Sequence, residues 1–121
     1  MTRLGYNTKI TVGEGRRPAV HAFADALGAK IVTSPAGVDA LLLDGETRIG
    51  FAYVADGEAL TEAQLRLAPW LELAVDDVGA AARRLDGMGL PRVEYADREH
   101  PYFTGPGGFV FRLAPARATT S

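Results

Sequence analysis

Histidines and their acidic neighbours are the first candidates for chemistry, because an imidazole changes its charge near neutral pH. The sequence of 121 residues has two histidines, His21 and His100. His100 follows Glu99, but adjacent strand residues point to opposite faces, so we expect this pair not to exchange protons. His21 lies off the apolar stripe of a predicted helix, and we expect it to be exposed to solvent. Two histidines so far apart in the sequence do not predict a metal site.

Other catalytic chemistry has little support. The sequence has no cysteine, which excludes disulfides, thiolate nucleophiles and thiolate metal sites. The Gly-Pro-Gly-Gly run at residues 105–108 lies between two predicted strands, so it predicts a turn. A phosphate loop would need a helix N-terminus there. The serines lie in a predicted turn and in the C-terminal tail, and no Ser-His-Asp arrangement is visible.

The composition is that of an ordinary globular chain, with 47% hydrophobic and 23% charged residues. The net charge of −2 leaves no basic excess for phosphate groups, which argues against a nucleic-acid partner. No apolar run approaches the ~20 residues that a membrane span needs, which argues against a membrane partner. The N-terminal residues have no apolar core of a secretory signal, so a cytoplasmic protein is the default expectation.

The elements that must position any site follow one pattern twice: strand, helix, then three strands. Helix ends are marked by Pro18 in a first turn and by Gly28 and Gly89 as stops. The predicted first-half elements are strand 6–12, helix 18–27 and strands 30–34, 38–43 and 48–54. Those of the second half are strand 70–75, helix 78–88 capped by Asp77, and strands 92–95, 101–104 and 109–113.

These patterns divide the chain into two modules of one α+β domain over residues 1–121. Module one spans about 5–55 and module two about 70–114. Between them lies a linker at about 56–69, with a helical turn at 61–65 capped by Thr61. A tail without apolar periodicity follows at 115–121.

Three segments carry a family resemblance. They are the strand and helix cap at 70–78 (Trp-Leu-Glu-Leu-Ala-Val-Asp-Asp-Val), the closing hairpin at 102–113, and Phe23 with the Leu27-Gly28 helix end. Together these segments resemble the vicinal-oxygen-chelate superfamily, which includes glyoxalases and bleomycin-resistance proteins. The resemblance implies two βαβββ modules that form a curled, cup-like mixed sheet with the helices on its outer face. It also implies a homodimer, in which two chains complete each other's cup.

In metal-using members, four His, Glu or Gln side chains point into the cup. The corresponding positions in this sequence are Asn7, Gly50, Trp70 and Arg112. Asparagine is a poor ligand, glycine and tryptophan offer no ligating side chain, and arginine is a fixed cation. We therefore expect no metal and no other cofactor.

Strand alternation predicts which side chains line the cup instead, because every second residue faces away from the helices. The predicted ligand-binding residues are Asn7, Lys9, Arg48, Trp70, Glu72 and Arg112. One interpretation is a pocket that stacks a flat ligand on Trp70 and pairs its acidic group with Arg112 or Lys9. In the alternative interpretation, Glu72 and Arg112 pair with each other, or this face is simply solvated.

Three functional hypotheses follow. The first is a metal-free small-molecule binding protein that resembles bleomycin-resistance proteins, with a flat ligand that is neutral or anionic. The second is a lyase or isomerase of the glyoxalase or dioxygenase kind with a non-standard or absent metal site, using Glu72 as a base or His100 as an acid. The third is an interaction domain without a ligand. The sequence does not identify the ligand, nor does it decide whether the modules pair within one chain or between chains.

Overall fold

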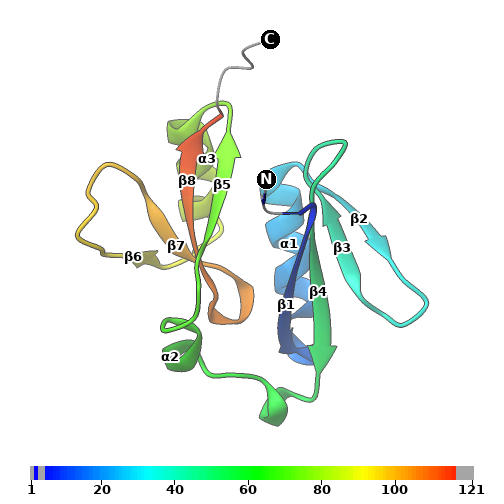
Figure 1. The fold of residues 1–121 in the computed structure, drawn as a ribbon. Coiled ribbons are helices and arrows are strands. Elements are labelled where there is room, and N and C mark those ends of the chain that lie inside the picture. The colour runs from blue at the N-terminus through cyan, green and yellow to red at the C-terminus, as the bar shows by residue number, and fades with distance from the viewer. Residues whose placement is uncertain (1, 3–4, 117–121) are drawn as a thin grey trace. The chain divides into compact units, whose positions relative to one another are not determined.

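The computed structural model describes residues 2 and 5–116, which fall into two compact units, residues 1–60 and 61–121. Each unit contains one open, four-stranded mixed sheet with one longer helix, so the α+β class and the doubled βαβββ order are confirmed (Figure 1). No helix in the described part of the chain is long and apolar enough to cross a membrane.

The first unit begins with a strand and a helix whose ends follow from local sequence. Its elements are β1 (Asn7–Gly13), η1 (Glu14–Arg16), α1 (Arg17–Leu27), β2 (Lys30–Thr33), β3 (Asp39–Leu42), β4 (Arg48–Val54) and η2 (Asp56–Glu58). Pro18 lies in the first turn of α1, where its missing N–H costs no hydrogen bond. Gly28 ends the helix in the left-handed conformation, with φ of 69°.

The sheet of the first unit has the strand order β1-β4-β3-β2. Strands β1 and β4 are parallel, and the other two pairings are antiparallel. Helix α1 covers one face and contributes Val20, Phe23 and Ala24 to a buried core. The sheet residues of this core are Val12, Leu41, Ile49 and Phe51. The opposite face of this sheet is therefore the one that is left for a binding site.

A buried carboxylate links α1 to this sheet. Asp39 has a fully buried side chain, which accepts hydrogen bonds from Thr33 (2.7 Å), Tyr53 (2.7 Å) and Arg17 (3.2 Å) and contacts His21 Nε2 at 2.9 Å. Burial acts to raise the pKa of Asp39, but the hydrogen bonds from Thr33, Tyr53 and His21 together hold it below its ordinary value. His21, expected to be free in solvent, is therefore half-exposed and bound to the sheet.

The second unit repeats the arrangement. Its elements are α2 (Glu62–Leu65), β5 (Leu71–Val75), α3 (Val78–Gly87), β6 (Arg92–Val93), β7 (Tyr102–Thr104), η3 (Pro106–Gly108) and β8 (Val110–Pro115). The strand order is β5-β8-β7-β6, with β5 and β8 parallel. Thr61 caps α2 in a capping box with Gln64, and Asp77 caps α3 through the Ala80 N–H at 2.9 Å. Both predicted caps are confirmed.

Many boundaries shift by one residue from the sequence-based expectation, and three of the differences bear on the candidate site or the tail. Strand β5 begins at Leu71, so Trp70 precedes it, because pairing with β8 extends only from Leu71 to Val75. Strand β6 ends at Val93, and residues 94–101 form a loop in which the Asp97 carboxylate accepts the Glu99 N–H (2.9 Å). Strand β8 continues to Pro115, the first residue of the predicted tail, and residues 117–121 of that prediction lie outside the described residues.

Candidate functional site

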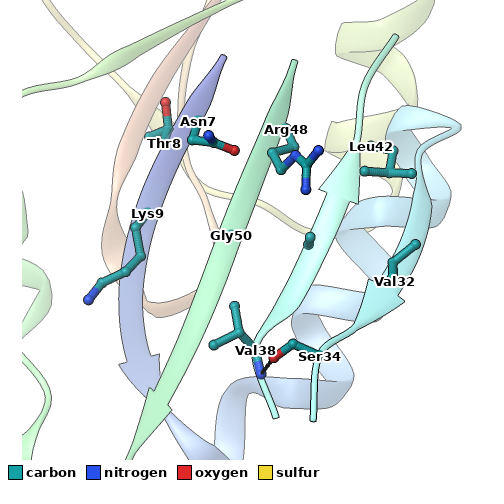
Figure 2. A pocket seen from close by; sticks show the side chains of 10 residues that line it. Asn7, Thr8, Lys9, Val32, Ser34, Val38, Leu42, Arg48 and Gly50 are labelled. Atoms are coloured by element: carbon teal, nitrogen blue, oxygen red, sulfur yellow. Dashed lines mark hydrogen bonds between the residues drawn. The ribbon is translucent and has the colours of Figure 1, made fainter. Parts of the chain in front are cut away.

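The face of the first sheet that α1 does not cover carries a hollow of about 550 Å³ (Figure 2), called here the sheet hollow. It is lined by Asn7, Thr8, Lys9, Val32, Ser34, Val38, Ala40, Leu42, Arg48 and Gly50. Three of the predicted ligand-binding residues, Asn7, Lys9 and Arg48, thus lie together. Strand register explains this, because Asn7 pairs with Arg48 and Lys9 pairs with Gly50 on the parallel strands β1 and β4.

The charge of the sheet hollow is entirely positive. Lys9 and Arg48 are its only charged lining residues, and neither side chain has a hydrogen bond or ion pair with any residue in the described part of the chain. Ser34, by contrast, is engaged, because its Oγ accepts the Val38 N–H at 3.1 Å. Two unpaired cations beside an apolar wall suit a ligand that has an acidic group and an apolar body.

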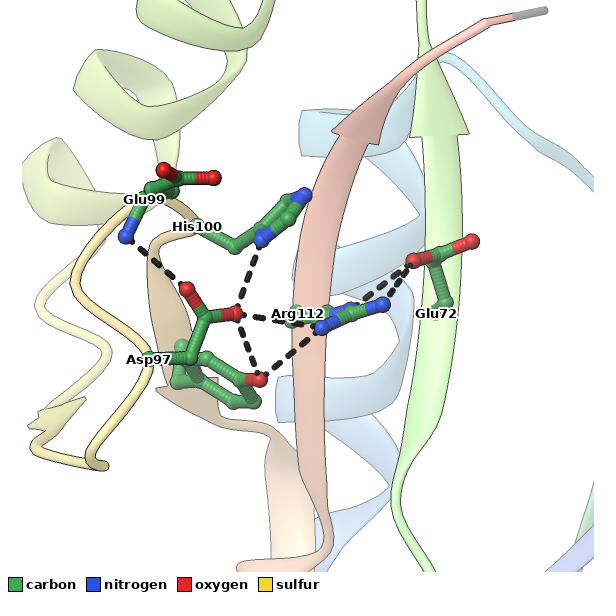
Figure 3. A network of polar contacts seen from close by, with 6 residues as sticks. Glu72, Asp97, Glu99, His100 and Arg112 are labelled. Atoms are coloured by element: carbon green, nitrogen blue, oxygen red, sulfur yellow. Dashed lines mark hydrogen bonds and ion pairs between the residues drawn. The ribbon is translucent and has the colours of Figure 1, made fainter.

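The other three predicted residues lie in the second unit, within a network of polar side chains (Figure 3). Arg112 on β8 and Glu72 on β5 occupy paired positions of the parallel strands. Arg112 Nε donates to Glu72 Oε1 (2.8 Å), and Arg112 Nη1 donates to Asp97 Oδ2 (3.1 Å) and to the Tyr102 hydroxyl (3.1 Å). The hydrogen bond that Arg112 donates to the Tyr102 hydroxyl, followed by the one it donates to Glu72, raises the pKa of Arg112, so this side chain stays cationic.

Aromatic rings flank this network. The Arg112 guanidinium carbon lies 4.6 Å from the centre of the Trp70 ring, a cation–π distance. The Trp70 and Tyr102 rings meet edge to face with centroids 5.7 Å apart, and Tyr95 contacts Tyr102 at 4.6 Å. Trp70 is 40% exposed, so part of its ring remains accessible. In the structure, Arg112 is thus already the partner of two carboxylates and a ring.

Asp97 and His100 form the outer end of the network. His100 Nδ1 lies 2.8 Å from Asp97 Oδ2, which also accepts the Tyr102 hydroxyl at 3.0 Å. The backbone N–H of Glu99, followed by His100 and Tyr102, lowers the pKa of Asp97 to about 2. Asp97 therefore stays ionised near neutral pH. Together with His100, Tyr95 and Tyr102, it lines a smaller hollow of about 260 Å³, called here the loop hollow.

Three of these network residues, Trp70, Glu72 and Arg112, were predicted from the sequence as ligand-binding residues, and His100 was considered as a candidate acid. The pairing of Glu72 with Arg112, one of the two interpretations, is the one that the structure contains. Asp97 and Tyr102 were missed, although Tyr102 lies opposite Arg112 in the β7–β8 register. His100, expected at the surface, has a side chain that is only 28% exposed because it contacts Asp97. The spacing Asp97-x-x-His100 was the signal that could have predicted this contact.

The four positions that the resemblance assigns to a metal do not suit one. Asn7 and Gly50 line the sheet hollow, Trp70 lies over Arg112, and Arg112 is a cation held by carboxylates. Among the described residues, no three His, Asp or Glu side chains are grouped as metal ligands. The donor set therefore disagrees with the metal chemistry that the fold family implies.

Comparison with known proteins gives a fold but no close relative. No protein-family model matches the sequence, and no curated protein matches it. Among solved structures, a glyoxalase/bleomycin resistance protein/dioxygenase superfamily member from Sphaerobacter thermophilus superposes with a TM-score of 0.67 at 17% identity, covering 96% of this chain and 99% of that one.

Two other structures are similar to the same degree. The fosfomycin resistance protein FosX from Mesorhizobium loti has a TM-score of 0.70 at 17% identity and covers 97% of this chain and 94% of its own. The antibiotic-binding protein TnmS3 from Streptomyces sp. CB03234 has a TM-score of 0.65 at 16% identity, with coverage of 96% and 98%. At these identities the likeness shows the fold alone.

Proposed function

We propose that this chain, which has the vicinal-oxygen-chelate fold, binds a small acidic molecule in its sheet hollow without a metal ion. The observation that carries the proposal is the pair of unpaired cations, Lys9 and Arg48, beside an apolar wall. A guanidinium can bind a carboxylate through two parallel hydrogen bonds, and a nearby ammonium adds a second positive charge. The name of TnmS3 shows that one protein of this fold binds an antibiotic.

The second unit supports the same proposal, because its predicted ligand-binding cation is already paired. Arg112, the other cation of the predicted lining, contacts Glu72 and Asp97, so an incoming acid would have to displace an existing ion pair. Lys9 and Arg48 require no such displacement. We therefore propose that the ligand is anionic and that its acidic group binds on the first sheet. Binding of this ligand does not require stacking on Trp70.

Calorimetric titration of the purified chain with octanoate, benzoate and octanamide tests this proposal. We expect at least one acid to bind and octanamide to bind at least tenfold more weakly, because the amide lacks the charge. Arg48→Gln and Lys9→Gln should each weaken acid binding several-fold. Arg66→Gln removes an exposed positive charge from the second unit and should leave binding unchanged. Failure of both acids to bind, or equal binding by all three variants, would contradict the proposal.

Blocking the hollow gives a second, independent test. Gly50 lies on its floor, and a Cβ atom there would meet only ordinary contacts, 3.6 Å from Val38 Cγ1 and 3.7 Å from the Thr8 carbonyl oxygen. Gly50→Val should therefore fold normally while its methyl groups fill the floor. We expect loss of acid binding with little change in melting temperature.

A second candidate function rests on the contact between His100 and Asp97. A proton on Nδ1 is donated to Asp97, which leaves Nε2 as the basic nitrogen beside the loop hollow. Nε2 has no hydrogen-bond partner among residues 2 and 5–116. This geometry fits a metal-free acid–base enzyme with His100 as the proton-transferring group. Glu72 is less suited to that role, because its carboxylate is bound to Arg112.

Incubation with fosfomycin in metal-free buffer tests this second candidate, since FosX shares the fold. Consumption of fosfomycin that is lost in His100→Asn, which keeps a group able to bond Asp97 but removes the Nε2 base, would support it. His21→Asn is the matched control in the first unit. Consumption that is equal in both variants would exclude His100 as the proton-transferring group for this compound.

A further inference from the structure

The sheet hollow changes its chemistry from one side of the sheet to the other. The strands lie in the order β1-β4-β3-β2, and all polar lining residues except Ser34, namely Asn7, Thr8, Lys9 and Arg48, come from β1 and β4. Ser34 follows β2, and its hydroxyl accepts the Val38 N–H. The apolar lining residues lie on the opposite side of the sheet. Ala40 and Leu42 are on β3, Val38 immediately precedes β3, and Val32 is on β2. Figure 2 shows Lys9 on β1 at one side and Leu42 and Val32 at the other, with the Arg48 side chain extending from β4 toward β3.

The polar side has the geometry of a site for a single head group. Arg48 and Gly50 are two residues apart on β4, and Lys9 pairs with Gly50, so the two cations occupy diagonal positions on adjacent strands. With strands about 4.8 Å apart and a rise of about 3.3 Å per residue, these positions lie roughly 8 Å apart. The long Lys9 side chain, which extends away from β4 in Figure 2, would turn toward an anion held by Arg48. No acidic side chain lines the hollow, so nothing in its lining competes for these cations.

The apolar side favours an aliphatic body over a flat aromatic one. Its lining contains branched and small aliphatic side chains, and no aromatic ring lines the sheet hollow. A planar ligand would find no stacking partner there, whereas a flexible chain can follow the corrugated surface of Val38, Leu42 and Val32. Val32 is 49% exposed on β2, which leaves a large apolar side chain for a ligand to cover.

Gly50 connects the two sides. It lies on β4, two residues after Arg48 and between Lys9 on β1 and Ala40 on β3, and it has no side chain to separate them. A ligand can therefore cross the floor at this point without displacing a protein group. Neighbouring strands are about 4.8 Å apart, so a ligand that runs from β4 to β2 crosses two spacings, roughly 10 Å.

We infer that the sheet hollow takes a medium-chain aliphatic carboxylate, which lies across the strands with its carboxylate over β1 and β4 and its chain over β3 and β2. This inference rests on the proposed function, since it specifies the acid that the hollow binds. The carboxylate meets Arg48 and Lys9, the chain crosses Gly50, and its far end covers Val32. The distance from β4 to β2 suits a chain of roughly 8–10 carbons.

Calorimetry with hexanoate, octanoate, decanoate and dodecanoate, and with benzoate and 3-phenylpropionate as comparators, tests the inference. Each buried methylene should strengthen binding by about threefold to fourfold, so each step of two carbons should give about tenfold. The gain should level off once the chain passes β2. Benzoate should bind more weakly than octanoate, because its ring has no aromatic partner in the lining.

Two variants test the two ends of the ligand separately. Arg48→Gln should weaken all four aliphatic acids by the same factor, because the head group is common to them. Val32→Thr is nearly isosteric and suits a strand, and it should weaken decanoate and dodecanoate by about threefold while leaving hexanoate unchanged. Hexanoate thus serves as the internal control for folding of the Val32 variant.

The outcomes distinguish this inference from the proposed function. If neither aliphatic nor aromatic acids bind, the proposed function fails and the inference fails with it. If acids bind through Arg48 but affinity is independent of chain length, or benzoate binds better than octanoate, only the inference is overturned. If chain length matters and Val32→Thr has no effect, the chain does not run toward β2, and the stated orientation is wrong.

Discussion

Glu72 and Arg112 stand opposite each other on the parallel strands β5 and β8, and their carboxylate and guanidinium are joined at 2.7–2.8 Å. Asp97 and the Trp70 ring hold the same guanidinium from other directions. One of the positions that the resemblance assigns to a metal ligand is therefore occupied by a cation with its own partners. This relationship decides which cations remain available for a ligand.

Removal of the guanidinium should destabilise the second unit more than removal of one of its acidic partners. Arg112→Met leaves the carboxylates of Glu72 and Asp97 without a counter-charge, whereas Glu72→Gln leaves Arg112 bound to Asp97. We expect a clearly lower melting temperature for Arg112→Met and a small decrease for Glu72→Gln. The double variant should be less destabilised than the sum of the two single variants, because they share one network. Strict additivity in urea denaturation would show that the two residues are uncoupled.

Among the carboxylates of the first unit, Asp39 should be the one whose substitution lowers the free energy of unfolding most. Asp39→Asn removes the charge that Arg17 and His21 contact and replaces one acceptor oxygen by a donor amide facing them. We expect a loss of about 2 kcal/mol in the free energy of unfolding, the scale for a buried polar group that loses its partners. Asp25→Asn, the same substitution at an exposed position of α1, is the control and should change stability little. Equal losses of stability in Asp39→Asn and Asp25→Asn would contradict the stabilising role of the buried Asp39 carboxylate.

Acid should weaken the fold as the pH falls from about 4 to about 2. The folded pKa of Asp97 is about 2, whereas an aspartate in an unfolded chain titrates near ~3.9. Between these values the unfolded chain binds more protons than the folded chain, so stability rises with pH in this window. The contribution is complete above about pH 4 and is lost as the pH falls through about 2. The lowered pKa of Asp39 adds a dependence of the same sign.

Urea denaturation from pH 2.5 to pH 5 checks this dependence. Asp97→Asn cannot titrate at this position and should show a smaller slope of stability against pH than the unmodified chain. A variant with an unchanged slope would show that Asp97 titrates alike in the folded and unfolded states.

Divalent metals should not stabilise the chain specifically. The family's metal positions fall on Asn7, Gly50, Trp70 and Arg112, which offer no His or carboxylate donor. We expect no bound metal in the purified, untagged protein and no shift of the melting temperature with Ni²⁺, Zn²⁺ or Mn²⁺. About one metal ion per chain, or a stabilisation that disappears in Glu72→Ala, would instead indicate a metal site that includes Glu72.

The homodimer expected from the resemblance remains a prediction. Leu67 is 91% exposed and Leu60 is 55% exposed, so the segment between the two sheets presents apolar side chains that a second chain could cover. Light scattering on a size-exclusion column should give a dimer for the unmodified chain. Leu67→Glu should shift the population toward the monomer, because it places a charge in an apolar contact. A monomer at every concentration would refute the dimer.

The sequence alone determined the repeated element order, because strand and helix periodicity, helix caps and turn glycines act over a few residues. It therefore predicted the caps at Thr61 and Asp77, the end of α1 at Gly28 and the side of the strands on which Lys9 and Arg48 lie. It also indicated the absence of metal-binding side chains at the family's positions, since that depends on residue type.

Only the tertiary structure decided which cations are free. Arg48 and Arg112 are the same residue type in corresponding strands, and local sequence does not distinguish them. The loop at residues 94–101 carries Asp97 to Arg112, and the N-terminal half of α1 carries Arg17 and His21 to Asp39. Such contacts join residues 15 to 22 positions apart, so they depend on how the chain returns on itself. Pairing between distant charges, which local periodicity does not encode, is what leaves Lys9 and Arg48 as the cations to which we propose the ligand's acidic group binds.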